Sequence, residues 1–315
     1  MKRLCGVLLA VMAATAAAAV PRQALAAFPG ANGRIAFNDA YTHNIYTVRP
    51  DGTGQTQLTT DGKSVTPRWS PNGKRIAFGR RGQLWVMNAD GTNQHRVASV
   101  TRAYQPAWSA DSRTLAYVHV PLGKKGDIWT VPVAGGTPKR ITHDAATTCG
   151  DSHPVFSPLG GFIAYDQQPG TPLSSGCVLD SGGPILYIQN LSTGARHPIS
   201  HASDPDYLAD GRGLVFSGDI EPDGSSFPDN LYASNLGGGI AQRVRLSDAF
   251  CAEEEPCFFE GAAAPSSTLE SRAAIWLYTR SSGQYCLVSN VSGAGFCKPG
   301  VATFFPQNID WQPKP

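Results

Sequence analysis

The residues of this sequence with the clearest capacity for chemistry are His153 and two aspartates, Asp151 and Asp204. Asp151 lies two positions before His153 and could orient its imidazole ring, while Asp204 lies further along the chain. A histidine beside a carboxylate can act as a general base or as a metal ligand. One histidine and two aspartates form a small set for either role, so their use depends on the elements that position them.

No established catalytic or cofactor motif accompanies these residues. The sequence contains no HExxH histidine pair, no GxSxG nucleophile elbow and no glycine-rich phosphate loop between a strand and a helix. The Asp51-Gly52 and Asp90-Gly91 pairs are typical of hairpin turns, because the spacing around them does not match a calcium-binding loop. We therefore expect neither a metal ion nor a cofactor.

A repeated segment supplies the framework around these residues. "WSPNGKRIAF" is followed 39 residues later by "WSADSRTLAY", and "FSPLGGFIAY", "YLADGRGLVF" and the degenerate "LESRAAIWLY" have the same spacing. Each copy is followed by a second apolar run such as "LWVMN", then by a turn and a last short run. The copies begin at Trp69, Trp108, Phe156, Tyr207 and Leu269.

Each repeat therefore contains four short apolar runs separated by turn residues. The runs are rich in β-branched and aromatic residues, as strands are. Asp-Gly and Asn-Gly pairs supply the positive φ of tight hairpins. No apolar period of 3.6 residues is sustained, so we expect few helices. A period of about 40 residues with four strands per unit is typical of β-propeller blades.

Two incomplete copies stand at the ends of the repeats. "GRIAFNDAYTHNIYTVRPDGTGQTQLT", from Gly33 to Thr59, supplies three strands and lacks the leading aromatic strand. "NIDWQP", from Asn308 to Pro313, supplies that leading strand alone. Joined, the two form one blade and leave no open sheet edge. The sequence therefore predicts an all-β, six-bladed propeller with four-stranded blades over residues 27–315, closed by the C-terminal strand.

The segments "PRWSPNGKRIAF" and "LWVMNADGTNQHRV" resemble the repeat of TolB-type six-bladed propellers, a WD-like repeat family of exported bacterial proteins. The resemblance extends from Phe28 to Pro315, is strongest in the second and third blades and is weakest in the sixth. It implies a cell-envelope or extracellular location. TolB proteins also carry an N-terminal α/β domain. Because Phe28 leads almost at once into the first blade, we expect that domain to be missing here.

The propeller fold would bring one polar position of each repeat to the mouth of the central channel. This position lies three residues before the anchor aromatic of each copy, and it is polar in all six. Two interpretations remain open. A wet channel mouth favours polar residues, or the positions form a ring of ligand donors and acceptors with His153 and Asp204 as a reactive pair on adjacent blades. The six residues are Thr66, Gln105, His153, Asp204, Ser266 and Asn308.

Long loops are predicted on the same face, over the fourth to sixth blades. Long loops on a rigid scaffold are where binding usually resides, so we expect any ligand there. The loops run from His143 to Ser152, Asp166 to Gly183, Ser217 to Asp229 and Asp248 to Pro265.

Six cysteines follow residue 26, an even number typical of disulfide-bonded exported proteins. Placing them on the predicted blades brings them together in three local pairs that would fasten irregular segments. Reactive thiols are the alternative. The predicted bridges are Cys149–Cys177, Cys251–Cys257 and Cys286–Cys297.

The first 26 residues have the pattern of a secretory signal peptide. Lys2 and Arg3 precede an apolar run, and Ala24-Leu25-Ala26 ends it with small residues at the cleavage spacing. Removing this segment leaves 23 basic and 24 acidic residues, a net charge of −1. A near-neutral surface argues against nucleic acid as the partner, and no later run is long and apolar enough to span a membrane.

Two functions are consistent with these observations. We expect a secreted or periplasmic, monomeric and non-enzymatic propeller that binds a protein or peptide partner. The alternative is a lyase or hydrolase that acts on a carbohydrate or lactone at the channel mouth. A converging set of acid, base and metal ligands would favour the enzyme, and the sequence offers only His153, Asp204 and Asp151.

Overall fold

The computed structural model describes most of the chain between residues 31 and 314. Within the described residues the chain forms β-strands and turns and contains no helix, so the predicted all-β class is confirmed. None of these residues belongs to a helix that could cross a membrane. The expected signal peptide, residues 1–26, lies outside the described part. The described ranges are 31–49, 52–97, 100–143, 148–173, 176–179, 183–218, 230–235, 244–245, 258–263, 274–279, 284–289, 295–299 and 306–314.

The strands form six four-stranded antiparallel sheets. Sheet 1 contains β26 (Pro306–Lys314), β1 (Ala31–Asp39), β2 (Ile45–Val48) and β3 (Thr56–Gln57). Sheet 2 contains β4 (Ser64–Trp69), β5 (Arg75–Arg80), β6 (Gln83–Asn88) and β7 (His95–Arg96). Sheet 3 contains β8 (Ala103–Trp108), β9 (Thr114–His119), β10 (Asp127–Pro132) and β11 (Lys139–Arg140).

The other three sheets repeat this order of strands. Sheet 4 contains β12 (Asp151–Phe156), β13 (Phe162–Gln167), β16 (Ile185–Asn190) and β17 (Arg196–Ser200). Sheet 5 contains β18 (Ala202–Tyr207), β19 (Gly213–Gly218), β20 (Asn230–Asn235) and β21 (Val244–Arg245). Sheet 6 contains β22 (Phe258–Ala263), β23 (Ala274–Thr279), β24 (Gln284–Ser289) and β25 (Gly295–Pro299).

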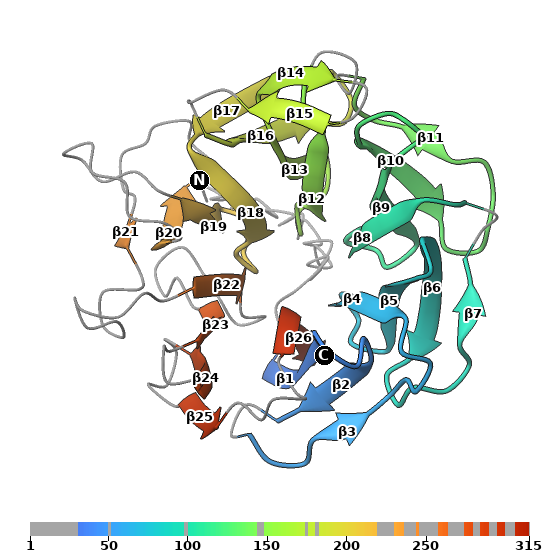
Figure 1. Cartoon of the computed structure of the whole chain (residues 1–315), viewed down its shortest axis with the longest axis vertical. Coiled ribbons are helices and arrows are strands. Elements are labelled where there is room, and N and C mark those ends of the chain that lie inside the picture. The colour runs from blue at the N-terminus through green and yellow to red at the C-terminus, as the bar shows by residue number, and fades with distance from the viewer. Residues whose placement is uncertain are drawn as a thin grey trace, which may run out of the picture.

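Figure 1 shows the six sheets in succession around a common centre, with the first strand of each sheet nearest to it. Each of these innermost strands contacts the innermost strand of the next sheet, and β26 contacts both β22 and β4. The strands β26 and β1, from opposite ends of the chain, pair directly, with Ile35 opposite Trp311 and Ala36 opposite Asp310. The Asp310 carboxylate also accepts a hydrogen bond from the Trp69 backbone N–H in sheet 2.

The apolar cores lie between neighbouring sheets. One cluster joins Ala36 and Ile45 of sheet 1 to Trp69 and Phe78 of sheet 2. Equivalent clusters join sheets 2 and 3, sheets 3 and 4, and sheets 4 and 5. The second strand of a sheet is therefore covered on both faces, which explains why its sequence is a continuous apolar run rather than an alternating one.

A recurring turn joins the first strand to the second. In sheet 2 the Gly73 N–H donates to the Ser70 carbonyl oxygen at 2.7 Å, and the same bond recurs in sheets 3, 4 and 5. Gly73 has a φ of 67°, in the left-handed region that glycine adopts without steric cost. The turn signals that mark the repeat in the sequence thus fix the spacing between its strands.

The connection between β13 and β16, predicted as a long loop, contains a further hairpin. Strands β14 (Gly170–Leu173) and β15 (Gly176–Leu179) pair with Thr171 opposite Val178 and Pro172 opposite Cys177. The glycine, proline and serine residues of this segment favoured a loop in the sequence. The pairing of the backbone groups in the hairpin satisfies hydrogen bonds that a loop would leave to water.

Removing the C-terminal strand should destabilise the whole chain. Deleting residues 308–315 takes most of β26 from sheet 1 and exposes the edge of β1. We expect the melting temperature to fall by roughly 10 °C or more, because several kcal/mol of pairing and packing are lost. Deleting residues 314–315 alone is the control and should have little effect. Equal melting temperatures for the 308–315 deletion and the full chain would contradict the role given to β26.

Candidate functional site

The innermost strands of sheets 2 to 5 share an irregularity at the predicted ring position. In each strand the pairing with the second strand shifts register there, as it does between Ser152 and Val155 of β12. The residue at the shift has a left-handed backbone, which costs a residue other than glycine about 1–2 kcal/mol. Its φ is 51° at Thr66, 51° at Gln105, 47° at His153 and 49° at Asp204.

These bulges direct backbone N–H groups away from their own sheet. The His153 N–H donates to the Gln105 side-chain carbonyl of sheet 3 at 3.1 Å, and the Thr66 N–H donates to the buried Asn38 amide oxygen of sheet 1 at 2.9 Å. A bulge re-aims a side chain while its freed donor binds elsewhere. The four predicted residues thus take equivalent positions at the same end of their strands, a surface we call the His153 face.

His153 is the centre of an ion cluster between sheets 4 and 5. Its Nδ1 lies 3.0 Å from Asp166 Oδ1 and 3.3 Å from Asp166 Oδ2. The same Nδ1 lies 3.0 Å from Asp204 Oδ1. The side chain of Asp166 is 2% exposed, that of His153 31% and that of Asp204 45%. One carboxylate is therefore buried beneath the ring and the other is open to solvent.

The surroundings of His153 favour its charged form. Burial lowers the pKa of His153, but the carboxylates of Asp166 and Asp204 raise it, and Arg68 opposes them; the resulting pKa is about 9. At pH 7 the imidazolium form would then predominate. A general base must be neutral before it accepts a proton, so this His153 is poorly suited to that role and well suited to hold charge and hydrogen bonds.

The other predicted site residues have different positions. Asp151 accepts hydrogen bonds from the Gln167 amide at 2.9 Å and from the Thr142 hydroxyl, and it is 3% exposed. The orienting role that the sequence assigned to Asp151 thus falls to Asp166. Asn308 lies in β26, where the structure does not describe its side chain, and Ser266 lies outside the described residues.

Asp166 itself was missed by the sequence analysis, although the repeat contains a signal for it. It is the fifth residue of β13, opposite Ser152. The fifth residues of β5, β9 and β19 are Gly79, Val118 and Ser217. Asp166 is the one carboxylate at this position in sheets 1 to 5, where sheet 1 has Asn38, and a carboxylate on a strand buried on both faces requires a charged partner. That partner is His153, which lies on the neighbouring strand β12.

No group of three or more histidine, cysteine, aspartate or glutamate side chains among the described residues is arranged to hold a metal ion. In the His153 cluster both carboxylates face the same ring nitrogen. Thr66 Oγ1 is a further polar atom of the ring positions. It is buried and has no hydrogen-bond partner among the described residues, so it has free capacity for a water molecule or a ligand.

Two of the predicted disulfides receive support from the backbone. Cys149 is disulfide-bonded, and its N–H donates to the Gln168 carbonyl oxygen at 2.8 Å, just before the hairpin that contains Cys177. Cys286 of β24 lies directly opposite Cys297 of β25. Directly opposed residues of antiparallel strands have the Cα separation that a disulfide needs. Cys251 and Cys257 lie outside the described residues, and all three pairings stay predictions.

Comparison with known proteins bears on this architecture. No protein-family model and no curated protein matches the chain. Among solved structures it is similar to TolB from Acinetobacter baumannii, with a TM-score of 0.66 and 16% identity over 90% of this chain and 67% of that one. A putative TolB from Agrobacterium tumefaciens gives a TM-score of 0.60 and 17% identity, covering 87% and 90%. The chain folds as a TolB-like β-propeller.

Propellers of other activities share this fold at a lower level of similarity. The β-propeller domain of the trilobed protease from Pyrococcus furiosus has a TM-score of 0.51 and 15% identity, covering 81% of this chain and 76% of that one. A mutant of the apocarotenoid oxygenase of Synechocystis also has a TM-score of 0.51, with 12% identity over 88% of this chain and 74% of that one. The predicted resemblance is confirmed for the fold, and the function has to be argued from the site.

The raised pKa of His153 gives a test of the ion cluster. A histidine whose pKa is higher in the folded chain than in the unfolded one stabilises the fold below the unfolded value, near 6.5. That contribution is lost as the pH rises through about 9. We expect stability to fall by roughly 1–3 kcal/mol over this interval, after allowance for the partly exposed ring.

The measurement compares thermal unfolding of the wild type and of His153→Asn at pH 6.5 and pH 9.5. Asparagine tolerates the left-handed backbone and keeps a donor for Asp166, but it does not titrate. The difference between the two proteins should shrink at the higher pH. A His153 ring that titrates by NMR at or below 6.5 would contradict the cluster, and Asp166→Asn should lower the observed pKa.

Peptide mapping without reduction tests the disulfides. We expect the linked pairs Cys149–Cys177, Cys251–Cys257 and Cys286–Cys297. Cys149 lies beside the hairpin that contains Cys177, Cys286 lies opposite Cys297, and Cys251 and Cys257 are close in the sequence. Any peptide that links Cys149 or Cys177 to a cysteine of sheet 6 would show that the loops are placed wrongly.

Proposed function

We propose that this chain is an exported, non-enzymatic β-propeller that binds a protein or peptide partner through its His153 face. The observation that carries the proposal is the shared left-handed bulge at Thr66, Gln105, His153 and Asp204. Strained backbone of this kind persists where the surrounding structure over-determines it, and it clusters at ligand-binding sites. Here the strain is repeated in four consecutive sheets, so it arrays polar groups over a surface rather than around one reacting atom.

The charge state of the cluster favours binding over catalysis. With its pKa near 9, His153 is an imidazolium at neutral pH, between a buried and an exposed carboxylate. Such an arrangement fixes hydrogen-bond donors and acceptors in advance, which lowers the ordering cost of binding a partner. A lyase or hydrolase that begins with proton abstraction by His153 would instead need the neutral ring.

We infer that the six sheets form a closed six-bladed ring, with sheet 1 as the blade completed by β26. The pairing of β26 with β1 and the contacts of β26 with β22 and β4 support this closure. Closure by β26 covers the edge of β1 that could otherwise act as a template for aggregation, in accordance with the expected monomer.

We also infer a secreted or periplasmic location and the removal of residues 1–26. The amino-terminal pattern of the sequence and the disulfide at Cys149 support both inferences, because disulfides persist in oxidising compartments. The fold shared with TolB from Acinetobacter baumannii is in accordance with such a location.

Affinity capture tests the proposed surface. The mature chain is immobilised and exposed to culture medium and envelope extract of the native organism, and captured proteins are identified by mass spectrometry. The double variant His153→Asn, Asp204→Asn removes the exposed charges but tolerates the left-handed backbone. We expect it to capture at least about tenfold less partner, because central interface residues contribute about 1–2 kcal/mol each.

The control places the same two substitutions on the opposite face. His95 and Asp90 are exposed beside the turn between β6 and β7, so the variant His95→Asn, Asp90→Asn matches the chemistry and changes the other surface. It should capture as much partner as the wild type. Loss of capture in this control, with full capture by the His153/Asp204 variant, would contradict the proposal.

A further inference from the structure

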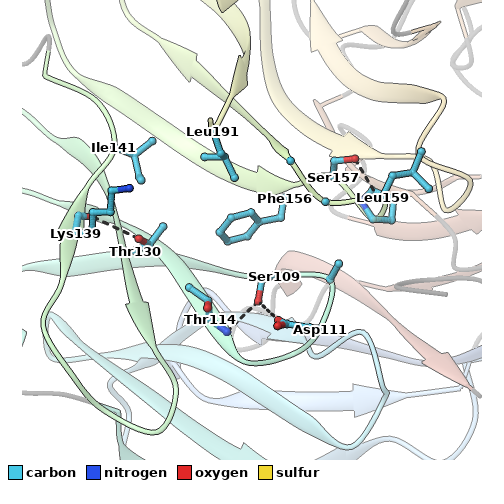
Figure 2. Close-up of a pocket in the computed structure, with 14 residues that line it drawn as sticks. Ser109, Asp111, Thr114, Thr130, Lys139, Ile141, Phe156, Ser157, Leu159 and Leu191 are labelled. Carbon is cyan, nitrogen blue, oxygen red and sulfur yellow. Dashed lines mark hydrogen bonds between the residues drawn. The ribbon is translucent and has the colours of Figure 1, made fainter. Parts of the chain in front are cut away.

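A cavity of about 480 Å³ opens between sheets 3 and 4, at the end of the strands opposite the His153 face. Its floor is the ring of Phe156, and Ile141 and Leu191 form part of its apolar wall. Figure 2 shows the Phe156 ring projecting to the middle of the lining residues, with Ser109 and Thr114 on one side and Leu191 on the other. This volume is in the range of pockets that hold small organic ligands.

The sequence explains why a cavity exists at this junction. Where sheet 2 meets sheet 3, the anchor residue is Trp108 and the first residue of the preceding second strand is Arg75. The Arg75 guanidinium stacks 4.9 Å from the Trp108 ring and donates to the Ser112 carbonyl oxygen at 2.7 Å. The Trp108 indole N–H donates to the Arg68 carbonyl oxygen at 2.9 Å. Two large side chains thus fill that junction.

The equivalent residues between sheets 3 and 4 are both smaller. Phe156 replaces the tryptophan and Thr114 replaces the arginine, since each holds the same place at the end of β12 and the start of β9. Between sheets 4 and 5 the pair is Phe162 and Tyr207, again with two large rings. Among these three junctions, the one with Thr114 and Phe156 therefore has the smallest filling residues, and the cavity occupies the space they leave.

The charged groups at the rim are not equivalent. Asp111 Oδ1 accepts hydrogen bonds from the Ser109 hydroxyl at 2.6 Å and the Arg113 N–H at 3.0 Å, so this oxygen already has two partners. The Lys139 ammonium makes no hydrogen bond or ion pair among the described residues, and it lies across Phe156 from Asp111 in Figure 2. The Lys139 end of the cavity thus offers an uncommitted positive charge beside an apolar chamber.

We propose that this cavity is a binding site for a small organic anion with an aromatic or branched apolar body. The body packs on Phe156, Ile141 and Leu191, and the anionic head group pairs with Lys139 near the Thr130 hydroxyl. The site is separate from the surface proposed for partner binding and does not depend on it.

Three probes of one shape test the charge preference on the full mature chain: 3-phenylpropionate, 3-phenylpropanol and 3-phenylpropylammonium. Binding is followed by ligand-observed NMR titration. We expect the carboxylate to bind with a Kd of about 1 mM or tighter, and roughly threefold to tenfold more tightly than the alcohol. Lys139→Gln should bring the affinity for the carboxylate down to that for the alcohol, while Lys74→Gln, an exposed lysine in the turn between β4 and β5 of sheet 2, should change nothing.

Two variants fill the cavity with residues that the neighbouring junctions use. Phe156→Trp adds an indole whose N–H can reach the Ala107 carbonyl, the equivalent of Arg68, and Thr114→Phe adds the uncharged ring that Phe162 supplies between sheets 4 and 5. Either should reduce binding of all three probes at least tenfold without lowering the melting temperature. If the substitution at Phe156 disturbs folding, the substitution at Thr114 alone still tests whether filling the cavity prevents binding.

No binding of any probe, equal binding of the carboxylate and the alcohol, or binding that survives both filling variants would overturn the proposal.

Discussion

The apolar side chains of this protein are buried between neighbouring sheets, and the rest of the structure depends on that arrangement. A single four-stranded sheet has two faces to cover and cannot cover either alone. The described clusters join sheets 1 and 2, 2 and 3, 3 and 4, and 4 and 5 in turn. Sheets 2, 3 and 4 are therefore each held by both neighbours, and the pairing of β26 with β1 brings the two ends of the repeat together. This mutual dependence makes the scaffold rigid enough to carry strain elsewhere.

The strain is found where the innermost strands begin. Left-handed residues at four equivalent positions free backbone donors, and the side chains of Asn38 and Gln105 accept two of them from the adjacent sheet. His153 then joins two sheets electrostatically, with Asp166 beneath it and Asp204 beside it. The same contacts that connect the sheets leave a polar surface that is organised before any partner arrives, and they favour the protonated form of the His153 ring.

Much of the fold could be predicted from the sequence because its signals are local and repeated. The spacing between Trp69 and Trp108, and the turn residues after each anchor, predict the strands and the sheet formed from both ends of the chain. The same alignment of the repeats predicted the polar positions at the channel mouth. Four of them, Thr66, Gln105, His153 and Asp204, have the same backbone conformation in the structure. The left-handed backbone at these positions was not predicted, because a bulge depends on pairing between strands and has no fixed residue type outside glycine.

The features that escaped prediction depend on contacts between repeats. Asp166 is one residue in an apolar strand, and only the bulge of the facing strand brings His153 to it. The β14–β15 hairpin has the composition of a loop. The cavity beside Phe156 lies where two smaller side chains, Thr114 of sheet 3 and Phe156 of sheet 4, meet between the sheets. Sequence alignment shows each change separately, but only the packing shows that they coincide.

Hydrogen exchange on the captured complex tests the central claim, that a rigid propeller presents the His153 face to its partner. Exchange measured by mass spectrometry in the free and bound chain should slow in peptides that cover residues 148–156 and 202–207 and change little in the turns at 89–93. The scaffold strands should exchange slowly in both states, because their amides are paired within the sheets. Slowing confined to the turns of the opposite face, with residues 148–156 and 202–207 unchanged, would contradict the account.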